Sequence, residues 1–167
     1  MDRYECPFPV PEEHLRMVGV IAAQWEWIER TLERAVAGVM ELDYSRVAMF
    51  LANISFSDKC DLFLAHGRVF QESHPTEWKE ITTAIKGLYE ARATRNAFIH
   101  CTWKMGPEPG APVRASVRTK GGTLKVEEIP VTTDDMYAAA KEIWNAGHAL
   151  AALIKKYDLL TEEEKPA

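Results

Sequence analysis

The stretch PTEWKEITTAIKGLYEARATRNAFIHCTW, Pro75 to Trp103, combines a core-facing helical pattern with an unusual group of polar residues. Proline suits the first position of a helix, because the N–H it lacks has no partner there. The pattern therefore predicts a helix from Pro75 to about Trp103. Its inner stripe, with members three or four residues apart, consists of Trp78, Ile81, Ile85, Leu88, Arg92, Arg95 and Ile99. Two arginines stand where a bundle helix normally carries apolar side chains.

The two arginines on this stripe need a partner or a ligand, because a charge on a core face is costly unless it is paired or bound. The ordinary interpretation is that Arg92 and Arg95 are cations favoured by the dipole near a helix C-terminus, with His100 a structural histidine. Their place on the stripe favours carboxylate partners inside the bundle or an anionic ligand. Glu29, beside the inner stripe of an earlier helix, is a candidate counter-charge.

Two further polar residues follow Arg92 at steps of four, Asn96 and His100, so these three side chains share one side of the helix. Arg95 lies about 140° from His100 around an ideal helix and about 7.5 Å from it along the axis. Simple helical stacking therefore does not bring this pair together. They can form one site if the helix loosens near its end, if the arginine reaches round, or if a second copy supplies the partner across a two-fold axis.

Four more helices are predicted around this one. They run from Glu12 to about Leu42, from Tyr44 to Ile54, from Asp58 to about Gln71 with Ser57 as N-cap, and from a Thr132–Asp135 capping box to about Asp158. The first helix has the inner stripe Val18, Ile21, Trp25, Ile28, Leu32, Ala35, Val39 and Leu42. The last has the inner face Met136, Ala140, Ile143, Gly147, Leu150 and Ile154.

Residues 106–131 interrupt the helical pattern with a loop and a predicted β-hairpin. Alternating apolar residues flank Gly121 and Gly122, as hairpin strands do around a tight turn. Basic residues on the hairpin indicate a solvated strand face, with an arm that guides RNA as the alternative; they are Arg114, Arg118, Lys120 and Lys125. With an extended lead-in over 1–11 and a tail over 159–167, residues 1–167 form a single domain. The fold class is all-α, a bundle of four to five helices with a β-hairpin inserted before the last one.

The composition points to an ordinary globular protein. The net charge of −5 argues against a general nucleic-acid coat, no apolar run approaches the length that spans a bilayer, and the N-terminus does not resemble a signal peptide. Three widely spaced cysteines predict neither disulfides nor a zinc site, and a reducing cytoplasm is expected. His14, His66, His74 and His148 have no metal-ligand spacing, so no metal or cofactor is predicted.

The sequence RNAFIH, from Arg95 to His100, resembles the Arg-x4-6-His motif of the HEPN superfamily, in the form with a polar residue after the arginine. The segment ISFSDKCDLF, from Ile54 to Phe63, also resembles the inter-helix segment of bacterial members. The resemblance implies a HEPN-like helical bundle with the motif near the end of a long, late helix. It further implies metal-independent RNA cleavage by a homodimer with the motif at the shared interface, as in bacterial toxins with an antitoxin partner.

The roles implied for the motif residues agree with their chemistry. An imidazole can act as general base on a ribose 2′-hydroxyl or as general acid on the leaving oxygen, and a guanidinium can hold the scissile phosphate. The resemblance assigns catalysis to Arg95, Asn96 and His100, and we add Arg92 and Glu29 as phosphate-site residues, with Glu26 and Glu33 as rivals of Glu29.

Two departures from the family pattern concern the groove for RNA. Cys101 and Thr102 follow the motif where family members carry a glycine, and the hairpin insertion is not a general feature of the superfamily. Two other hypotheses therefore stay open. One is a non-catalytic dimeric module that binds a nucleotide or another anion, and the other is a purely structural interaction domain.

Overall fold

The computed structural model describes residues 10–107, 112–120 and 123–159. Within these ranges the chain forms six helices and one three-stranded antiparallel sheet. The helices are α1 (Glu12–Val39), α2 (Tyr44–Leu51), α3 (Phe56–His66), α4 (Arg68–Ser73), α5 (Pro75–Ile99) and α6 (Thr133–Lys156). The strands are β1 (Thr102–Met105), β2 (Pro112–Lys120) and β3 (Thr123–Pro130). The fold is mainly helical, as predicted, although nearly all of the predicted lead-in and tail lies outside the described residues.

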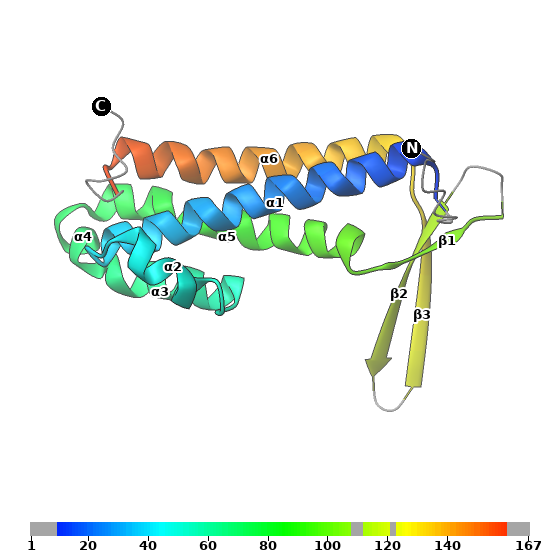
Figure 1. Cartoon of the computed structure of the whole chain (residues 1–167), viewed down its shortest axis with the longest axis horizontal. Helices are drawn as coiled ribbons and strands as arrows, with labels where there is room; N and C mark the ends of the chain where they lie inside the picture. The colour runs from blue at the N-terminus through cyan, green and yellow to red at the C-terminus, as the bar shows by residue number, and fades with distance from the viewer. Residues whose placement is uncertain (1–9, 108–111, 121–122, 160–167) are drawn as a thin grey trace, which may run out of the picture.

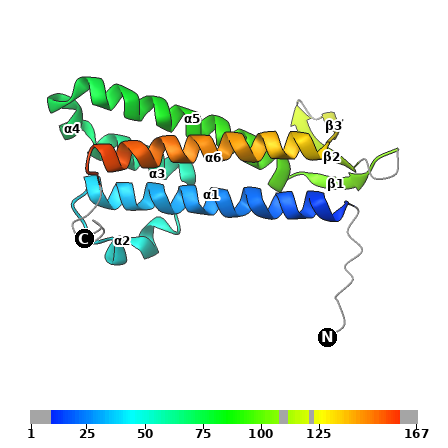
Figure 2. The same cartoon turned by 90° about the horizontal axis from the view of Figure 1, so that it is seen from above.

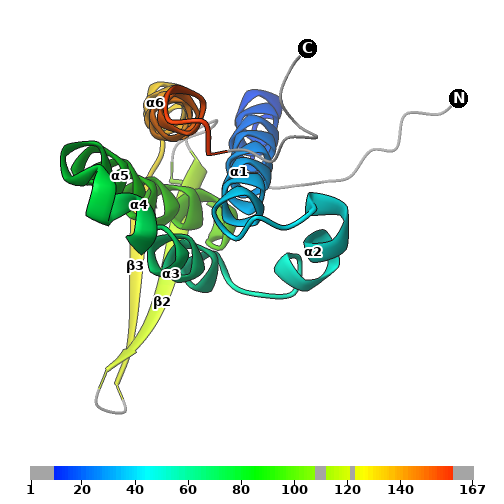
Figure 3. The same ribbon diagram turned by 90° about the vertical axis from the view of Figure 1, so that its left-hand side faces the viewer.

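Three long helices, α1, α5 and α6, run side by side along the molecule, and α5 runs opposite to the other two (Figures 1 and 2). Seen end-on in Figure 3, they surround a common centre together with α3, while α2 stands to one side next to α1. The sheet lies where α1 and α6 begin and α5 ends, and β2 and β3 project beyond the helices (Figure 1). The end of α5 is therefore the place where the bundle meets the sheet.

The core consists mainly of the predicted inner stripes of α1 and α6, the α5 stripe as far as Leu88, and apolar residues of α3. Beyond Leu88 the predicted α5 stripe is wrong, because the buried residues there are Ala91 and Phe98, whereas Arg92, Arg95 and Ile99 are only partly buried.

In α1, all stripe residues from Ile21 to Ala35 are buried. The prediction that this helix reaches Leu42 is wrong, because α1 ends at Val39 and Leu42 lies beyond it as an exposed residue. The whole predicted inner face of α6 is buried, and its capping box forms as expected, with the Thr132 hydroxyl accepting from the Asp135 amide. Gly147 lets α6 approach α1 closely, because a Cβ there would lie 2.6 Å from Ile28 Cγ1. None of the helices in the described ranges is long and apolar enough to cross a membrane.

The predicted helix from Asp58 to Gln71 is wrong in two respects. It begins at Phe56, because the hydroxyl of Ser55, rather than that of Ser57, accepts the hydrogen bond from the Asp58 amide at 3.2 Å. It is also two helices, α3 and α4, which meet at Gly67. The Trp78 ring occupies the space that a side chain at Gly67 would need, so the backbone turns against this ring.

The predicted hairpin is confirmed, with β2 and β3 antiparallel and Lys120 opposite Thr123. The turn residues 121–122 lie outside the described part of the chain. The prediction missed β1, which pairs with β2 so that Trp103 lies opposite Arg114. The prediction that α5 reaches Trp103 is therefore wrong, and the inserted region begins at Thr102 rather than at residue 106.

Candidate functional site

The last turn of α5 is closed by side chains from the segment that follows it. The carbonyl of Phe98 accepts hydrogen bonds from Trp103 Nε1 at 3.2 Å and from Cys101 Sγ at 3.4 Å. The carbonyl of Ala97 accepts from Arg114 Nη1 at 3.1 Å, and the Arg114 guanidinium lies over the Phe98 ring. A helix end leaves carbonyls without intrahelical partners and favours cations. These contacts explain why the helix ends at Ile99.

Beyond Ile99 the backbone leaves the helical path, and this brings Arg95 to His100. His100 has φ −105° and ψ 16°, while its amide still donates to the Asn96 carbonyl at 3.1 Å. Arg95 Nη1 lies 2.5 Å from His100 Nε2 and 2.9 Å from Asn96 Oδ1. The structure therefore brings together Arg95, Asn96 and His100 within one chain. The sequence left three ways for Arg95 and His100 to meet: a loosened helix end, a long reach of the arginine, or a second copy of the chain. In the structure they meet because the helix loosens at its end.

This contact favours one tautomer of the imidazole. A guanidinium nitrogen can only donate a hydrogen bond, so His100 Nε2 accepts in the tautomer that carries its proton on Nδ1. An unprotonated nitrogen on an exposed side chain is the form of histidine that can take a proton from a hydroxyl.

Arg95 is partly buried without a carboxylate in direct contact. Its guanidinium lies over the Trp25 ring at 5.9 Å, its Nε is buried with no hydrogen-bond partner, and it forms no ion pair with any described residue. Burial lowers the pKa of Arg95, and the charge of Glu29 opposes this effect. A half-buried cation without a carboxylate in direct contact is suited to an anionic ligand.

Asn96 and His100 line a pocket of about 370 Å³ between the end of α5 and the sheet. The opposite wall comes from one face of β2 and β3, where Arg114, Ser116 and Glu127 lie. The sequence indicated the α5 residues of this pocket but not those of the sheet, whose basic residues we interpreted as a solvated face. Arg114 is half-buried instead, whereas the side chains of Arg118 and Lys120 lie outside the described part of the chain.

Arg92, Arg95 and Glu29 do not line this pocket, and Arg95 is connected to it through its contacts with Asn96 and His100. Arg92 Nη1 donates to the hydroxyl of Ser57 at 2.7 Å, and its guanidinium lies over Phe56 at the start of α3. Glu29 accepts from Trp25 Nε1 at 2.6 Å, which holds the ring against which Arg95 packs. Glu29 therefore supports the Trp25 ring on which Arg95 packs, and Arg92 contacts the start of α3 instead of the pocket.

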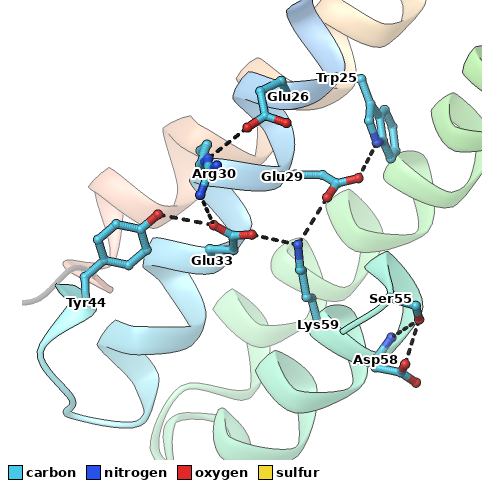
Figure 4. A network of polar contacts seen from close by, with 9 residues as sticks. All are labelled: Trp25, Glu26, Glu29, Arg30, Glu33, Tyr44, Ser55, Asp58 and Lys59. Carbon is cyan, nitrogen blue, oxygen red and sulfur yellow. Dashed lines mark hydrogen bonds and ion pairs between the residues drawn. The ribbon is translucent and has the colours of Figure 1, made fainter. Parts of the chain in front are cut away.

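The ion partner of Glu29 is Lys59 of α3, a residue that the sequence analysis missed (Figure 4). Lys59 Nζ lies 2.7 Å from Glu33 Oε1 and 3.1 Å from Glu29 Oε2, and the Lys59 and Glu33 side chains are each only 3% exposed. Burial alone would lower the pKa of Lys59, but the hydrogen bonds that its ammonium donates to both carboxylates, together with their charge, outweigh burial and the pKa is raised. The only sign of this pairing in the sequence is that Lys59 stands among the apolar residues Phe56, Cys60 and Phe63, which are buried. Such a position does not identify a carboxylate partner.

The remaining histidines and cysteines that the sequence offered as candidates do not take part in the proposed chemistry. His14 is buried, and its Nε2 lies 3.1 Å from the Val131 carbonyl. Cys101 lines the pocket, but burial raises the pKa of its thiol, which disfavours a reactive thiolate. No group of three or more His, Cys, Asp or Glu within residues 10–107, 112–120 and 123–159 is placed to hold a metal ion.

A comparison of the chain with protein-family models, curated proteins and solved structures gives no match.

Proposed function

We propose that the chain is a HEPN-like, metal-independent endoribonuclease of the toxin or defence type, with Arg95, Asn96 and His100 as its reaction site. The observation that carries the proposal is the contact of Arg95 Nη1 with Nε2 of His100, a residue that lines a polar pocket. A general base beside a phosphate-binding cation is the pair that cleavage at a ribose 2′-hydroxyl requires.

The reaction balances with these residues and one water molecule. A phosphate bound at Arg95 takes the guanidinium hydrogen bond in place of the imidazole, which frees His100 Nε2 to accept the 2′-hydroxyl proton. O2′ then bonds to phosphorus and the bond from phosphorus to O5′ breaks. Water gives a proton to the leaving O5′, and the hydroxide that remains takes the proton from His100. The products are a 2′,3′-cyclic phosphate and a 5′-hydroxyl end. Arg95 stabilises the extra charge on the phosphate oxygens, and Asn96 holds Arg95 through its Oδ1.

Purified full-length protein is expected to cleave RNA in the presence of a chelator and to leave 2′,3′-cyclic phosphate ends. The matched control substrate is the same strand with a 2′-deoxy nucleotide at the cleaved position, which lacks the attacking oxygen and should stay intact. End-group analysis of the fragments checks both statements. Absence of cleavage on a broad RNA panel, or equal cleavage of the deoxy substrate, would contradict the proposal.

The proposal includes a homodimer with a shared cleft, as the resemblance implies; the antitoxin partner stays a prediction of that resemblance. Since Arg95 and His100 already meet within one chain, the second chain is needed to wall the exposed side of His100 rather than to complete the pair. Light scattering at micromolar concentration is expected to give twice the chain mass of 18.9 kDa. A monomeric mass would count against a shared cleft.

A second candidate is a non-catalytic module that holds a nucleotide or another anion at Arg95. The half-buried guanidinium of Arg95 favours it, because within the described residues this cation has no carboxylate in direct contact and is suited to an anionic ligand. Tight nucleotide binding by a protein that does not cleave RNA would favour this function over the first.

A further inference from the structure

The pocket at the end of α5 has a second wall whose side chains no sequence motif indicates. Alternation along the strands places Arg114 and Ser116 of β2 on the same face as Glu127 of β3, and Ser116 lies directly opposite Glu127 in the register. These three residues line the pocket together with Asn96 and His100 of α5. The inserted sheet therefore builds half of the cavity beside the proposed reaction site.

This second wall presents both a carboxylate and a guanidinium. Within the described part of the chain Glu127 forms no ion pair, whereas its neighbour Glu128 is paired with Lys104 at 2.6 Å. The bond from Arg114 to the Ala97 carbonyl uses one of the five N–H donors of its guanidinium. The pocket can accept N–H donors at Glu127 and donate to an acceptor at Arg114.

We propose that this pocket binds a guanine base, with Glu127 as the residue that selects it. The Watson–Crick edge of guanine carries two adjacent N–H donors, N1–H and N2–H, which match the two oxygens of a carboxylate, and next to them the acceptor O6. Arginine is a common partner of guanine acceptors, and a pocket of about 370 Å³ lies within the range of small-molecule sites.

The other bases fit this pair of charges less well. Uracil presents a single N–H between two carbonyl oxygens, and these oxygens would face the carboxylate of Glu127. Cytosine and adenine present one amino group next to an acceptor nitrogen. Each of these bases leaves a carboxylate oxygen without a donor, and an unmet polar group in a binding site lowers affinity.

The inference rests on the proposed function for the placement of the nucleotide. His100 lines the pocket itself, so the nucleotide in the pocket is the one whose 2′-hydroxyl His100 activates. That nucleotide carries its phosphate on O3′, which makes guanosine 3′-monophosphate the appropriate probe. Its phosphate then lies toward Arg95 and its base toward Glu127.

Calorimetric titration of the full chain is expected to show guanosine 3′-monophosphate binding at least about tenfold more tightly than uridine 3′-monophosphate, the size of one bidentate base contact. Glu127→Gln is expected to remove this preference, because its amide NH2 faces the N–H donors of guanine. Glu128→Gln is the matched control, since it removes a carboxylate one position away on the opposite strand face, and it should keep the preference.

Equal binding of the two nucleotides, no binding of the guanosine nucleotide, or a preference unchanged in Glu127→Gln would overturn the inference. The same experiments distinguish failure of the guanine pocket from failure of the proposed nuclease function. A protein that cleaves RNA without preferring guanine disproves the guanine pocket alone. A protein with Glu127-dependent guanosine binding that never cleaves RNA disproves the nuclease alone.

Discussion

Replacing His100 with alanine is expected to reduce RNA cleavage at least about a hundredfold, the lower end of the range for loss of a general base. His100 is the exposed C-cap of α5, and its side chain contacts Arg95 without entering the core. The variant should therefore fold normally, with an unchanged circular dichroism spectrum and melting temperature. Cleavage rates at saturating RNA in chelator measure the effect.

The control for this experiment is His66→Ala. His66 is also an exposed histidine at the end of a helix, but it lies in the last turn of α3 and does not line the pocket. It should cleave RNA at the wild-type rate. A His100→Ala variant as active as wild type would remove the base from the proposed mechanism and indicate a contaminating nuclease.

Replacing Lys59 with methionine is expected to lower the free energy of unfolding by about 3–5 kcal/mol, the usual cost of removing one partner from a buried ion pair. Methionine fills nearly the same space, so the effect reports charge rather than a cavity. Glu33, only 3% exposed, would lose the ammonium that lies 2.7 Å from it. Urea denaturation measures the change, and Lys86→Met on the exposed side of α5 should stay within about 0.5 kcal/mol of wild type.

A double variant, Lys59→Met with Glu33→Met, should be less destabilised than the two single changes together, because the two side chains contact each other directly; in the Lys59→Met variant Glu33 keeps only Arg30 at 3.1 Å and the Tyr44 hydroxyl at 3.2 Å. The effect of Lys59 also depends on pH. Its pKa is raised in the folded protein, so its stabilisation is fully present below the ordinary value of 10.5 and is lost as pH rises through the raised value. A Lys59→Met variant within about 1 kcal/mol of wild type at neutral pH would contradict the ion-pair account.

The long helices could be predicted from the sequence because each carries a continuous apolar stripe and a clear start. Pro75 and the Thr132–Asp135 capping box mark helix starts through local chemistry alone. The break between α3 and α4 was not visible, because it depends on the Trp78 ring, which comes from another helix. Strand β1 was also missed because it depends on residues elsewhere in the chain: it pairs with residues 112–115 of β2.

The candidate site was predictable in its residues but not in its geometry. Arg92 and Arg95 stood out because they continue the spacing of the apolar stripe, yet only Arg95 reaches His100. The sequence suggested a carboxylate near these arginines, and Glu29 was identified, but its ion partner is Lys59. Glu127 carried no signal, because a glutamate on a hairpin strand usually faces solvent.

The side chains that donate to the last carbonyls of α5 come from residues that are synthesised after the helix. The helix ends at Ile99 because Trp103 and Arg114 donate to its final carbonyls, and Arg114 is made fifteen residues after the helix is complete. Until the ribosome has released that residue, the turn that carries His100 lacks part of its closure.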